Sequence, residues 1–149
     1  MTPTLCDPDR SRIVETARAW LGTPYRHQAS RRGVGCDCLG FLRGVWLEVY
    51  GVELERPPPY TPDWSEFNGR ERLLEAGLRL LPRVPVPQAR PADALLFRMR
   101  RGAAAKHLGL LSAPDRFLHA YSTLGVVESP FDPGWRRRVI AAFRLPPPS

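Results

Sequence analysis

The sequence predicts an α+β fold in which N-terminal helices pack on a C-terminal antiparallel sheet of about five strands. Two observations favour this class. Apolar residues recur at helical spacing in the first half of the chain, whereas short apolar segments separated by turns fill the second half. Because the helices come first and the strands later, the strands are expected to pair in an antiparallel sheet. The 149 residues suit one core, so residues 1–149 are predicted to form a single domain.

Three segments carry apolar residues three and four positions apart, as one face of a helix requires. The first two are followed by a glycine, Gly22 and Gly51, which is a common helix stop. The third contains an Asn68-Gly69 pair, which favours an early break. The predicted helices are 8–21, 38–50 and about 61–81.

The pattern changes after residue 81. The segment "LPRVPVPQARPAD" at 81–93 predicts a polyproline-like loop, because proline cannot donate the hydrogen bonds of a helix or a central strand. The segments that follow are short and separated by turns, as in a meandering sheet. The predicted strands are 94–99, 107–112, 116–121, 125–129 and 138–145.

The formal net charge is +7, and nearly all of the positive charge comes from arginine. A basic protein can bind nucleic acid, an anionic wall polymer or an acidic protein, but a solvated basic surface explains the same composition. The chain has no helix-turn-helix pattern and no ladder of aromatic and basic residues, so nucleic-acid binding is not predicted.

The chain contains no apolar run long enough to span a bilayer, and "MTPTLCDPDR" does not have the pattern of a signal peptide. The protein is therefore expected to be made in a reducing cytoplasm. In that compartment three cysteines are a poor disulfide framework.

Cys36 and Cys38 lie one residue apart, just before the second predicted helix, and they admit three interpretations. A zinc site could use them with His107 and His119, although the spacing is not the usual one. A disulfide between them would close a very small, strained ring. A nucleophile is the third interpretation, because the partial positive charge at a helix N-terminus favours a thiolate at Cys38.

A cysteine nucleophile needs a base, and the chain offers His27, His107 and His119. Ala113 lies in the predicted turn between two strands, and His107 and His119 are each six residues from it, one on either strand. They are therefore expected to be roughly opposite each other in a hairpin. One imidazole could act as the base and the other could orient it. Each histidine alone is explained as a polar residue near a sheet edge, but the set with Cys38 favours catalysis.

Five segments occur in an order that resembles the NlpC-type cysteine peptidases, papain-like enzymes that cut bacterial cell-wall peptides. The segments are "AWLGTPYRHQ", "GCDCLGF", "PADALLF", "KHLGLLS" and "RFLHAY". More narrowly, "TPYRHQAS" with "GVGCDCLG" resembles the branch found in phage tails and gene transfer agents. The resemblance covers the chain from about Ile13 to the final strand and implies a papain-like fold of the NlpC type.

The resemblance implies a role for each matching residue. The cysteine of the Asp-Cys-x-Gly-Phe motif is Cys38, the expected nucleophile, and the histidine that opens the following motif strand is His107, the expected base. His119 is the expected third member of the triad and orients His107. Tyr25 is expected near the nucleophile, where its hydroxyl assists substrate or oxyanion binding. Asp37 is expected either near the substrate or as a helix N-cap.

Two features depart from the pattern of the broad family. Leu39 stands where the family commonly has serine, and "YRHQ" replaces a glycine-rich continuation after Tyr25. His27 then either lines the cleft or satisfies loop backbone. The segment 52–92 carries no family motif, and we expect it to shape one wall of the groove.

By resemblance, the expected reaction is hydrolysis of a peptidoglycan stem peptide, most typically between D-glutamate and a diamino acid, without a metal or another cofactor. Expected partners are the stem peptide and the tail or baseplate proteins of a phage-like particle that is assembled in the cytoplasm. Two alternatives stay open: a non-catalytic tail module, and an amidase or acyltransferase with the same triad.

Overall fold

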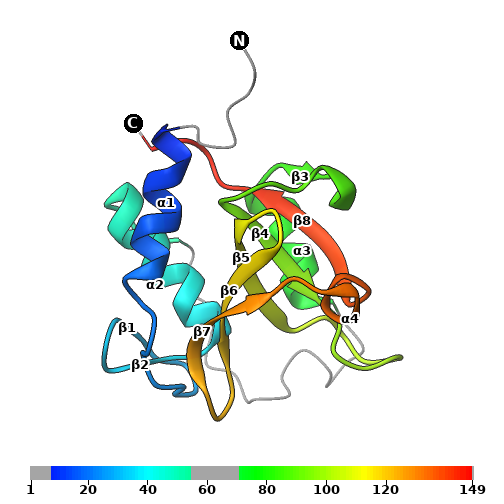
Figure 1. Ribbon diagram of the computed structural model, residues 1–149, viewed down its shortest axis with the longest axis horizontal. Coiled ribbons are helices and arrows are strands. Elements are labelled where there is room, and N and C mark those ends of the chain that lie inside the picture. The colour runs from blue at the N-terminus through cyan, green and yellow to red at the C-terminus, as the bar shows by residue number, and fades with distance from the viewer. Residues whose placement is uncertain (1–7, 55–70, 149) are drawn as a thin grey trace.

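Two helices cover one face of an antiparallel sheet (Figure 1). The computed structural model describes residues 8–54 and 71–148. Helix α1 (Pro8–Arg18) packs beside helix α2 (Cys38–Tyr50), and both helices contact the sheet. The predicted α+β class is therefore confirmed, with the helices first in the chain and the sheet after them.

The sheet has six strands in the order β3-β8-β4-β5-β6-β7, and each neighbouring pair is antiparallel. The strands are β3 (Arg83–Val84), β4 (Asp93–Phe97), β5 (His107–Ala113), β6 (Arg116–Tyr121), β7 (Gly125–Pro130) and β8 (Val139–Arg144). Five of them lie where the sequence predicts strands. The edge strand β3 is the sixth, and it lies within the predicted proline-rich loop.

The loop prediction for 81–93 is wrong at β3, and again at a short 3₁₀ helix, η1 (Val86–Gln88). Strand β3 pairs with β8 through only two residues, which lie between Pro82 and Pro85. The prolines therefore bracket the pairing without interrupting it, and β3 is at the sheet edge, where proline is tolerated.

Apolar side chains alternate between the two faces of the sheet, and each face has its own core. The core under α1 and α2 includes Ile13, Trp20, Phe41, Leu110 and Leu118. The core on the opposite face includes Leu95, Phe97, Leu111, Phe117 and Phe131. This double burial explains why the central strands read as continuous apolar runs.

The helix predictions were accurate for α2 and less so for the others. Helix α2 spans the predicted residues and ends at Gly51, whose φ of 74° is left-handed, as a C-cap requires. Helix α1 ends at Arg18 instead of residue 21, because a tight turn replaces its last predicted residues. Helix α3 (Arg72–Leu80) matches the end of the third predicted helix, and residues 61–70 lie outside the described part. Within residues 8–54 and 71–148, no helix is long and apolar enough to cross a membrane.

The predicted loop between the first two helices contains a small hairpin, and the last turn of the sheet contains a short helix. The hairpin pairs β1 (Ser30–Arg31) with β2 (Gly35–Cys36). The short helix is α4 (Pro133–Arg136), which is capped by Asp132 and precedes β8. Both elements were missed because they are too short to show a periodic pattern.

Candidate active site

Cys38 is the first residue of α2, and Asp37 caps that helix. One carboxylate oxygen of Asp37 accepts a hydrogen bond from the Gly40 N–H at 2.7 Å, and the other accepts from the Gln28 N–H at 2.8 Å. The Asp37 side chain is buried. The N-cap interpretation of Asp37 is thus seen directly, and its contact with a substrate stays a prediction.

The glycine of the "CLGF" motif is required by close packing. A Cβ at Gly40 would lie 1.8 Å from the carbonyl oxygen of Ala29, a backbone atom that cannot move aside easily. The loop before β1 therefore lies directly on the first turn of α2. Phe41, the next residue, is buried edge-on against Trp20, with ring centroids 6.0 Å apart. These contacts hold the helix start that carries Cys38.

The thiol of Cys38 lies against the backbone at the start of β5. Its sulfur is 3.3 Å from the carbonyl oxygen of Lys106, and the backbone of Leu108 also forms a hydrogen bond with it. These two residues flank His107. Within the part of the chain that the structure describes, the hydrogen bond of the thiol goes to this carbonyl and not to an imidazole. The thiol of Cys38 therefore contacts the backbone on both sides of His107.

His107 and His119 form a hydrogen-bonded pair that continues to a serine. The Nε2 of His107 is 2.8 Å from the Nδ1 of His119, and the Nε2 of His119 is 2.9 Å from the Oγ of Ser129. Because one nitrogen of His107 faces His119, only its Nδ1 is left to face a thiol. Ser129 was not among the site residues predicted from the sequence.

The two histidines are diagonal neighbours, which corrects the expectation that they lie opposite each other. The β5–β6 register pairs Leu110 with Leu118, and it shifts before Ala113 pairs with Arg116. This register offsets His107 from His119 by two positions along the strands. Their rings still meet, with centroids 5.0 Å apart, because diagonal positions are within reach of aromatic side chains.

Aromatic side chains surround the two imidazoles on the face of the sheet away from α2. Trp135 of α4 has its ring centroid 5.9 Å from that of His107 and 5.1 Å from that of His119. The other neighbouring rings are those of Phe97, Phe117 and Tyr121. Burial lowers the pKa of His107 to about 4, and burial together with the charge of His107 lowers the pKa of His119 to about 3. Both imidazoles are therefore neutral at pH 7.

The thiol is also neutral at rest. Burial, and after it the negative charge of Asp37, raises the pKa of Cys38 to about 12. Hydrogen bonds from the backbone of Leu108, Leu39 and Cys38 itself act in the opposite direction but are weaker. The backbone at the helix N-terminus favours a thiolate at Cys38, as expected, but desolvation outweighs that effect in the resting protein.

Tyr25 lies near Cys38, Asp37 and Cys36. Its backbone bridges that of Cys36 in parallel, and its side chain is 37% exposed. Burial, followed by the charges of Cys38, Asp37 and Cys36, raises the pKa of Tyr25 to about 12. The hydroxyl thus remains protonated at neutral pH and can donate a hydrogen bond beside the thiol.

The structure gives Cys36 and His27 surroundings that explain them without a catalytic role. Cys36 is fully buried in β2, and both it and Cys38 are free thiols, so the disulfide interpretation is wrong for this pair. His27 has its Nδ1 3.9 Å from a carboxylate oxygen of Asp37. Among the described residues, no group of three or more histidine, cysteine or acidic side chains is arranged to hold a metal ion.

Two residues of this site escaped sequence reasoning. Ser129 is aligned with Phe117 in the β6–β7 hairpin, so it shares a face with His119, and the register of that hairpin is the signal that points to it. Trp135 gives no comparable signal, because it reaches the histidines from a four-residue helix that the sequence pattern does not reveal.

Comparison with known proteins identifies the family of this chain. Residues 22–144 match the model of the NlpC/P60 family. Murein DD-endopeptidase MepS/Murein LD-carboxypeptidase of Escherichia coli strain K12 is 28% identical over 137 residues, which cover 91% of this chain and 63% of that protein. The chain thus spans less than two thirds of the length of this relative.

Solved structures share the fold. The NlpC/p60 domain of the peptidoglycan hydrolase SagA is 20% identical and superposes with a TM-score of 0.67, covering 91% of this chain and 98% of that domain. RipD from Mycobacterium tuberculosis is described as a non-catalytic NlpC/p60 domain protein adapted to peptidoglycan binding; it is 15% identical, with a TM-score of 0.60 over 93% of this chain and 98% of its own. The family match, which spans most of the chain, shows that this protein belongs to the NlpC/P60 family.

Proposed function

We propose that this domain is a cysteine peptidase that hydrolyses the stem peptide of peptidoglycan. In this proposal Cys38 is the nucleophile, His107 is the general base and His119 positions His107. The observation that carries the proposal is the hydrogen-bonded series from His107 through His119 to Ser129, beside a thiol held at the start of α2. A domain that only binds has no need of a thiol next to an oriented base.

The tautomers follow from this series. If the Nδ1 of His107 is to accept a proton, its Nε2 carries hydrogen and donates to the Nδ1 of His119. His119 then carries its own hydrogen on Nε2 and donates to the Oγ of Ser129. Each group thus fixes the tautomer of the next, and the series ends with the basic nitrogen of His107 directed away from His119.

The reaction begins from neutral partners. At rest the sulfur lies 3.3 Å from the Lys106 carbonyl, and in this proposal it turns from that carbonyl toward the Nδ1 of His107 when substrate binds. The thiol then passes its proton to that nitrogen while the sulfur attacks the amide carbonyl, so no thiolate needs to be stored at rest. Because the thiol pKa is about 12 and that of His107 about 4, transfer in the absence of substrate is strongly unfavourable.

The oxyanion forms at the N-terminus of α2. The backbone N–H groups of Cys38 and Leu39 lie in the first turn, where helical N–H groups have no partner within the helix. They and the hydroxyl of Tyr25 can stabilise the tetrahedral intermediate. Protonated His107 then donates to the leaving amine, which releases the first product and leaves a thioester on Cys38. Water, deprotonated by His107, hydrolyses the thioester.

The proposed bond joins D-glutamate to the diamino acid of the stem. The family resemblance supports this bond, whereas the name of the relative MepS describes a DD-endopeptidase. Mass spectrometry of digested muropeptides separates the alternatives. A new free amine on the diamino acid, next to D-glutamate, supports the proposal. Opened D-alanyl cross-links would assign the DD bond instead, and release of whole stems from the sugar would indicate an amidase.

The catalytic assignment is tested by replacing Cys38 with alanine. Digestion of purified wall by Cys38→Ala is expected to fall by roughly a thousandfold or more, because the nucleophile is lost. Cys36→Ala is the matched control, since it removes a buried thiol two residues away that has no part in the mechanism, and it should retain digestion. Equal digestion by Cys38→Ala and the parent protein would instead favour a binding role such as that described for RipD.

We also propose that the domain acts as part of a phage-like tail particle that opens the wall of a recipient cell. The support is the likeness of "TPYRHQAS" and "GVGCDCLG" to the tail branch of the family. Quantitative mass spectrometry of purified particles is expected to find the protein in a constant ratio to the tail proteins. Its absence from particles, with recovery from the cell envelope, would contradict this location.

A further inference from the structure

The indole of Trp135 lies against both imidazoles of the proposed active site. Its ring centroid is 5.1 Å from that of His119, with an interplanar angle of 77°, and 5.9 Å from that of His107, with an angle of 32°. Trp135 is half-buried, whereas His119 is only 1% exposed. Because one side of the indole reaches the surface and the other contacts a buried imidazole, Trp135 separates the histidine pair from solvent on this face of the sheet.

Two phenylalanines of the sheet enclose the same histidines from the inside. The ring centroid of Phe97 is 5.6 Å from that of His107, and the ring centroid of Phe117 is 4.3 Å from that of His119. Both phenylalanines are fully buried, and both also contact Trp135, with centroids 5.4 Å and 5.1 Å apart. They belong to the core of this face, whereas Trp135 packs on its margin. Removing the indole therefore opens the enclosure without emptying the core.

The short helix that carries Trp135 is anchored to the hairpin that carries both histidines. Just before α4, the N–H of Phe131 donates to the carbonyl of Asp115 at 2.7 Å. Arg136 donates to the carbonyl of Phe131 at 2.7 Å and to that of Pro114 at 3.1 Å. Pro114 and Asp115 form the turn between β5 and β6. The indole is thus fixed to the two strands whose imidazoles it contacts.

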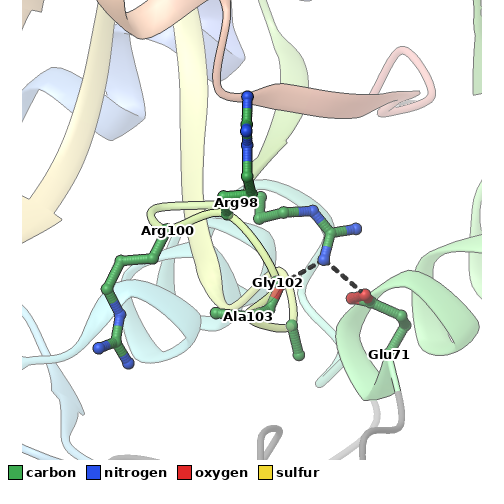
Figure 2. A pocket seen from close by; sticks show the side chains of 7 residues that line it. Glu71, Arg98, Arg100, Gly102 and Ala103 are labelled. Atoms are coloured by element: carbon green, nitrogen blue, oxygen red, sulfur yellow. Dashed lines mark hydrogen bonds and ion pairs between the residues drawn. The ribbon is translucent and has the colours of Figure 1, made fainter.

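The chain that follows α4 is anchored by β4. The N–H after the end of β4, that of Arg98, donates to the carbonyl of Arg138 at 2.8 Å. Figure 2 shows the side chain of Arg98 reaching between Ala103 and Glu71, and it donates to the Glu71 carboxylate at 2.9 Å. The guanidinium of Arg138 lies over the indole of Trp135, 5.7 Å from the ring centroid, where a cation is attracted to the aromatic face. The segment is therefore held on both sides of Trp135.

We propose that Trp135 is a positioning residue for the reaction: its indole keeps water from the hydrogen bond between His107 and His119 and so preserves one arrangement of their hydrogens. The inference rests on the proposed function and deepens it. The 2.8 Å bond needs one facing nitrogen to carry hydrogen and the other to accept it. Water at this bond would compete for both nitrogens and allow the opposite arrangement. In that arrangement His107 carries hydrogen on Nδ1, the nitrogen that must take the proton of Cys38, and it cannot act as the base.

The first test observes the imidazoles by ¹⁵N NMR of their side chains, which requires no turnover. In the parent protein each ring should show one neutral tautomer from pH 7 to 5, because burial lowers the pKa of His107 to about 4. In Trp135→Leu the titration midpoint of His107 should rise by about one pH unit or more, because water stabilises the charged form. The titratable neighbours Cys38 and Tyr121 are the same in both proteins. Arg138 also remains, and a nearby cation lowers an imidazole pKa, so a rise reports water and not the guanidinium.

The second test is steady-state cleavage of a synthetic tetrapeptide, L-alanyl-γ-D-glutamyl-diaminopimelyl-D-alanine. Trp135→Leu should lower kcat about tenfold and keep KM within about twofold, because the indole acts through the histidines and not on the substrate. Trp135→Phe retains an aromatic cover and should keep kcat within about threefold of the parent value. Arg136→Gln changes an exposed residue and loosens α4, so it should shift the midpoint of His107 in the same direction by a smaller amount, even if Trp135→Leu folds poorly.

The matched control is Trp46→Leu. Trp46 is also half-buried, but it lies on α2, packed on Tyr50 with ring centroids 4.2 Å apart and against the core of the opposite face. This variant should leave the titration of His107 unchanged and kcat within about twofold of the parent value. A parent-like titration and kcat in Trp135→Leu would overturn the proposal, as would a kcat loss equal to that of Trp46→Leu. A raised KM with unchanged kcat would make Trp135 a substrate contact and also overturn it.

The two measurements separate this proposal from the proposed function. If the parent protein cleaves no peptide but the titration of His107 shifts in Trp135→Leu, the proposed reaction fails, and protection of the histidine bond by the indole is still supported. If cleavage occurs and neither the titration nor kcat depends on Trp135, the positioning role fails alone.

Discussion

The bond between His107 and His119 shows how single residues set the chemistry of this site. Burial keeps both imidazoles neutral, and their 2.8 Å contact requires that one of the two facing nitrogens carries hydrogen and the other accepts it. The sequence places two histidines and one cysteine in the right order along the chain. From the sequence we missed that Ser129 continues the series, although the hairpin register points to it, and that Trp135 lies against both rings, because Trp135 belongs to a short helix without a periodic pattern.

Loss of the serine hydroxyl is predicted to slow the reaction. In Ser129→Ala the Nε2 of buried His119 loses its partner at 2.9 Å, so the tautomer of the pair is no longer held. We expect kcat to fall about tenfold with little change in KM, and the free energy of unfolding to fall by about 1–3 kcal/mol. Steady-state kinetics and urea unfolding measure the two effects.

The matched control for this prediction is Ser112→Ala. Ser112 is buried in the neighbouring strand β5 and donates to Glu128 at 2.7 Å, without touching a histidine. Its loss should lower stability by a similar amount and leave kcat near the parent value. Equal kcat values for the two variants would contradict the positioning role of Ser129.

Stability is predicted to fall in mild acid. Unfolded histidines bind a proton near pH 6.5, whereas the folded pKa values are about 4 for His107 and about 3 for His119. Between pH 6.5 and 4 the unfolded chain therefore holds more protons, so the free energy of unfolding decreases as pH falls. The expected slope is up to about 1.4 kcal/mol per pH unit for each imidazole. Urea unfolding between pH 7 and 5 measures it.

His119→Asn removes one of the two titrating groups and should reduce this slope by about half. Unfolding free energies that stay constant from pH 7 to 5 would contradict the burial of neutral imidazoles.

At the scale of elements, strand β7 is hydrogen-bonded to residues 22–23, which come just before Tyr25. The N–H of Gly22 bonds to the carbonyl of Val126 at 3.0 Å, and the N–H of Val126 bonds to the carbonyl of Thr23 at 2.9 Å. Gly125 has a φ of 77°, and a Cβ there would be 2.3 Å from the Thr23 carbonyl oxygen. Strand β7 thus approaches the segment more closely than any side chain allows.

Gly125→Ala is predicted to damage both stability and activity. It introduces a strained left-handed alanine and also forces the Thr23 carbonyl away, which displaces the neighbouring Tyr25. The expected loss in the free energy of unfolding is about 2–4 kcal/mol, with a decreased kcat/KM. Urea unfolding and peptide hydrolysis measure these effects.

Gly22→Ala separates the cost of the left-handed backbone from the cost of the clash with a neighbouring backbone atom. Gly22 has a similar φ of 87°, but nothing lies within 4 Å of its Cβ position. This variant should show only the backbone strain, about 1 kcal/mol, with nearly normal activity. If both alanine variants lose the same stability and activity, close approach of β7 to this segment has no role.

At the scale of the whole molecule, a buried ion network joins the first helix to the sheet and to the end of the chain. Asp93 of β4 is fully buried and pairs with Arg10 of α1 at 2.6 Å and with Arg144 of β8 at 3.0 Å. Arg10 also donates to the carbonyls of Leu145 and Pro91. Desolvation lowers the pKa of Arg10, and Asp93 opposes that effect.

Asp93→Asn is predicted to be strongly destabilising. Removing this charge leaves the guanidinium of Arg10 buried without a counter-charge, which costs about 3–5 kcal/mol. Asp115→Asn, in the exposed turn between β5 and β6, is the control and should change stability by no more than about 0.5 kcal/mol. A loss below about 1 kcal/mol for Asp93→Asn in urea unfolding would show that the network does not anchor α1.

The amino-acid sequence by itself determined the class of fold, the bounds of α2 and the approximate positions of five strands, because apolar periodicity and capping residues act over a few neighbouring positions. It also supplied the residues of the candidate site, Cys38, His107 and His119. Tertiary structure alone decided the diagonal register of the histidines, their bond to Ser129, and the neutral thiol. It also decided the contact of Trp135 with both imidazoles. These features depend on burial and on contacts between distant segments, and local sequence patterns contain neither.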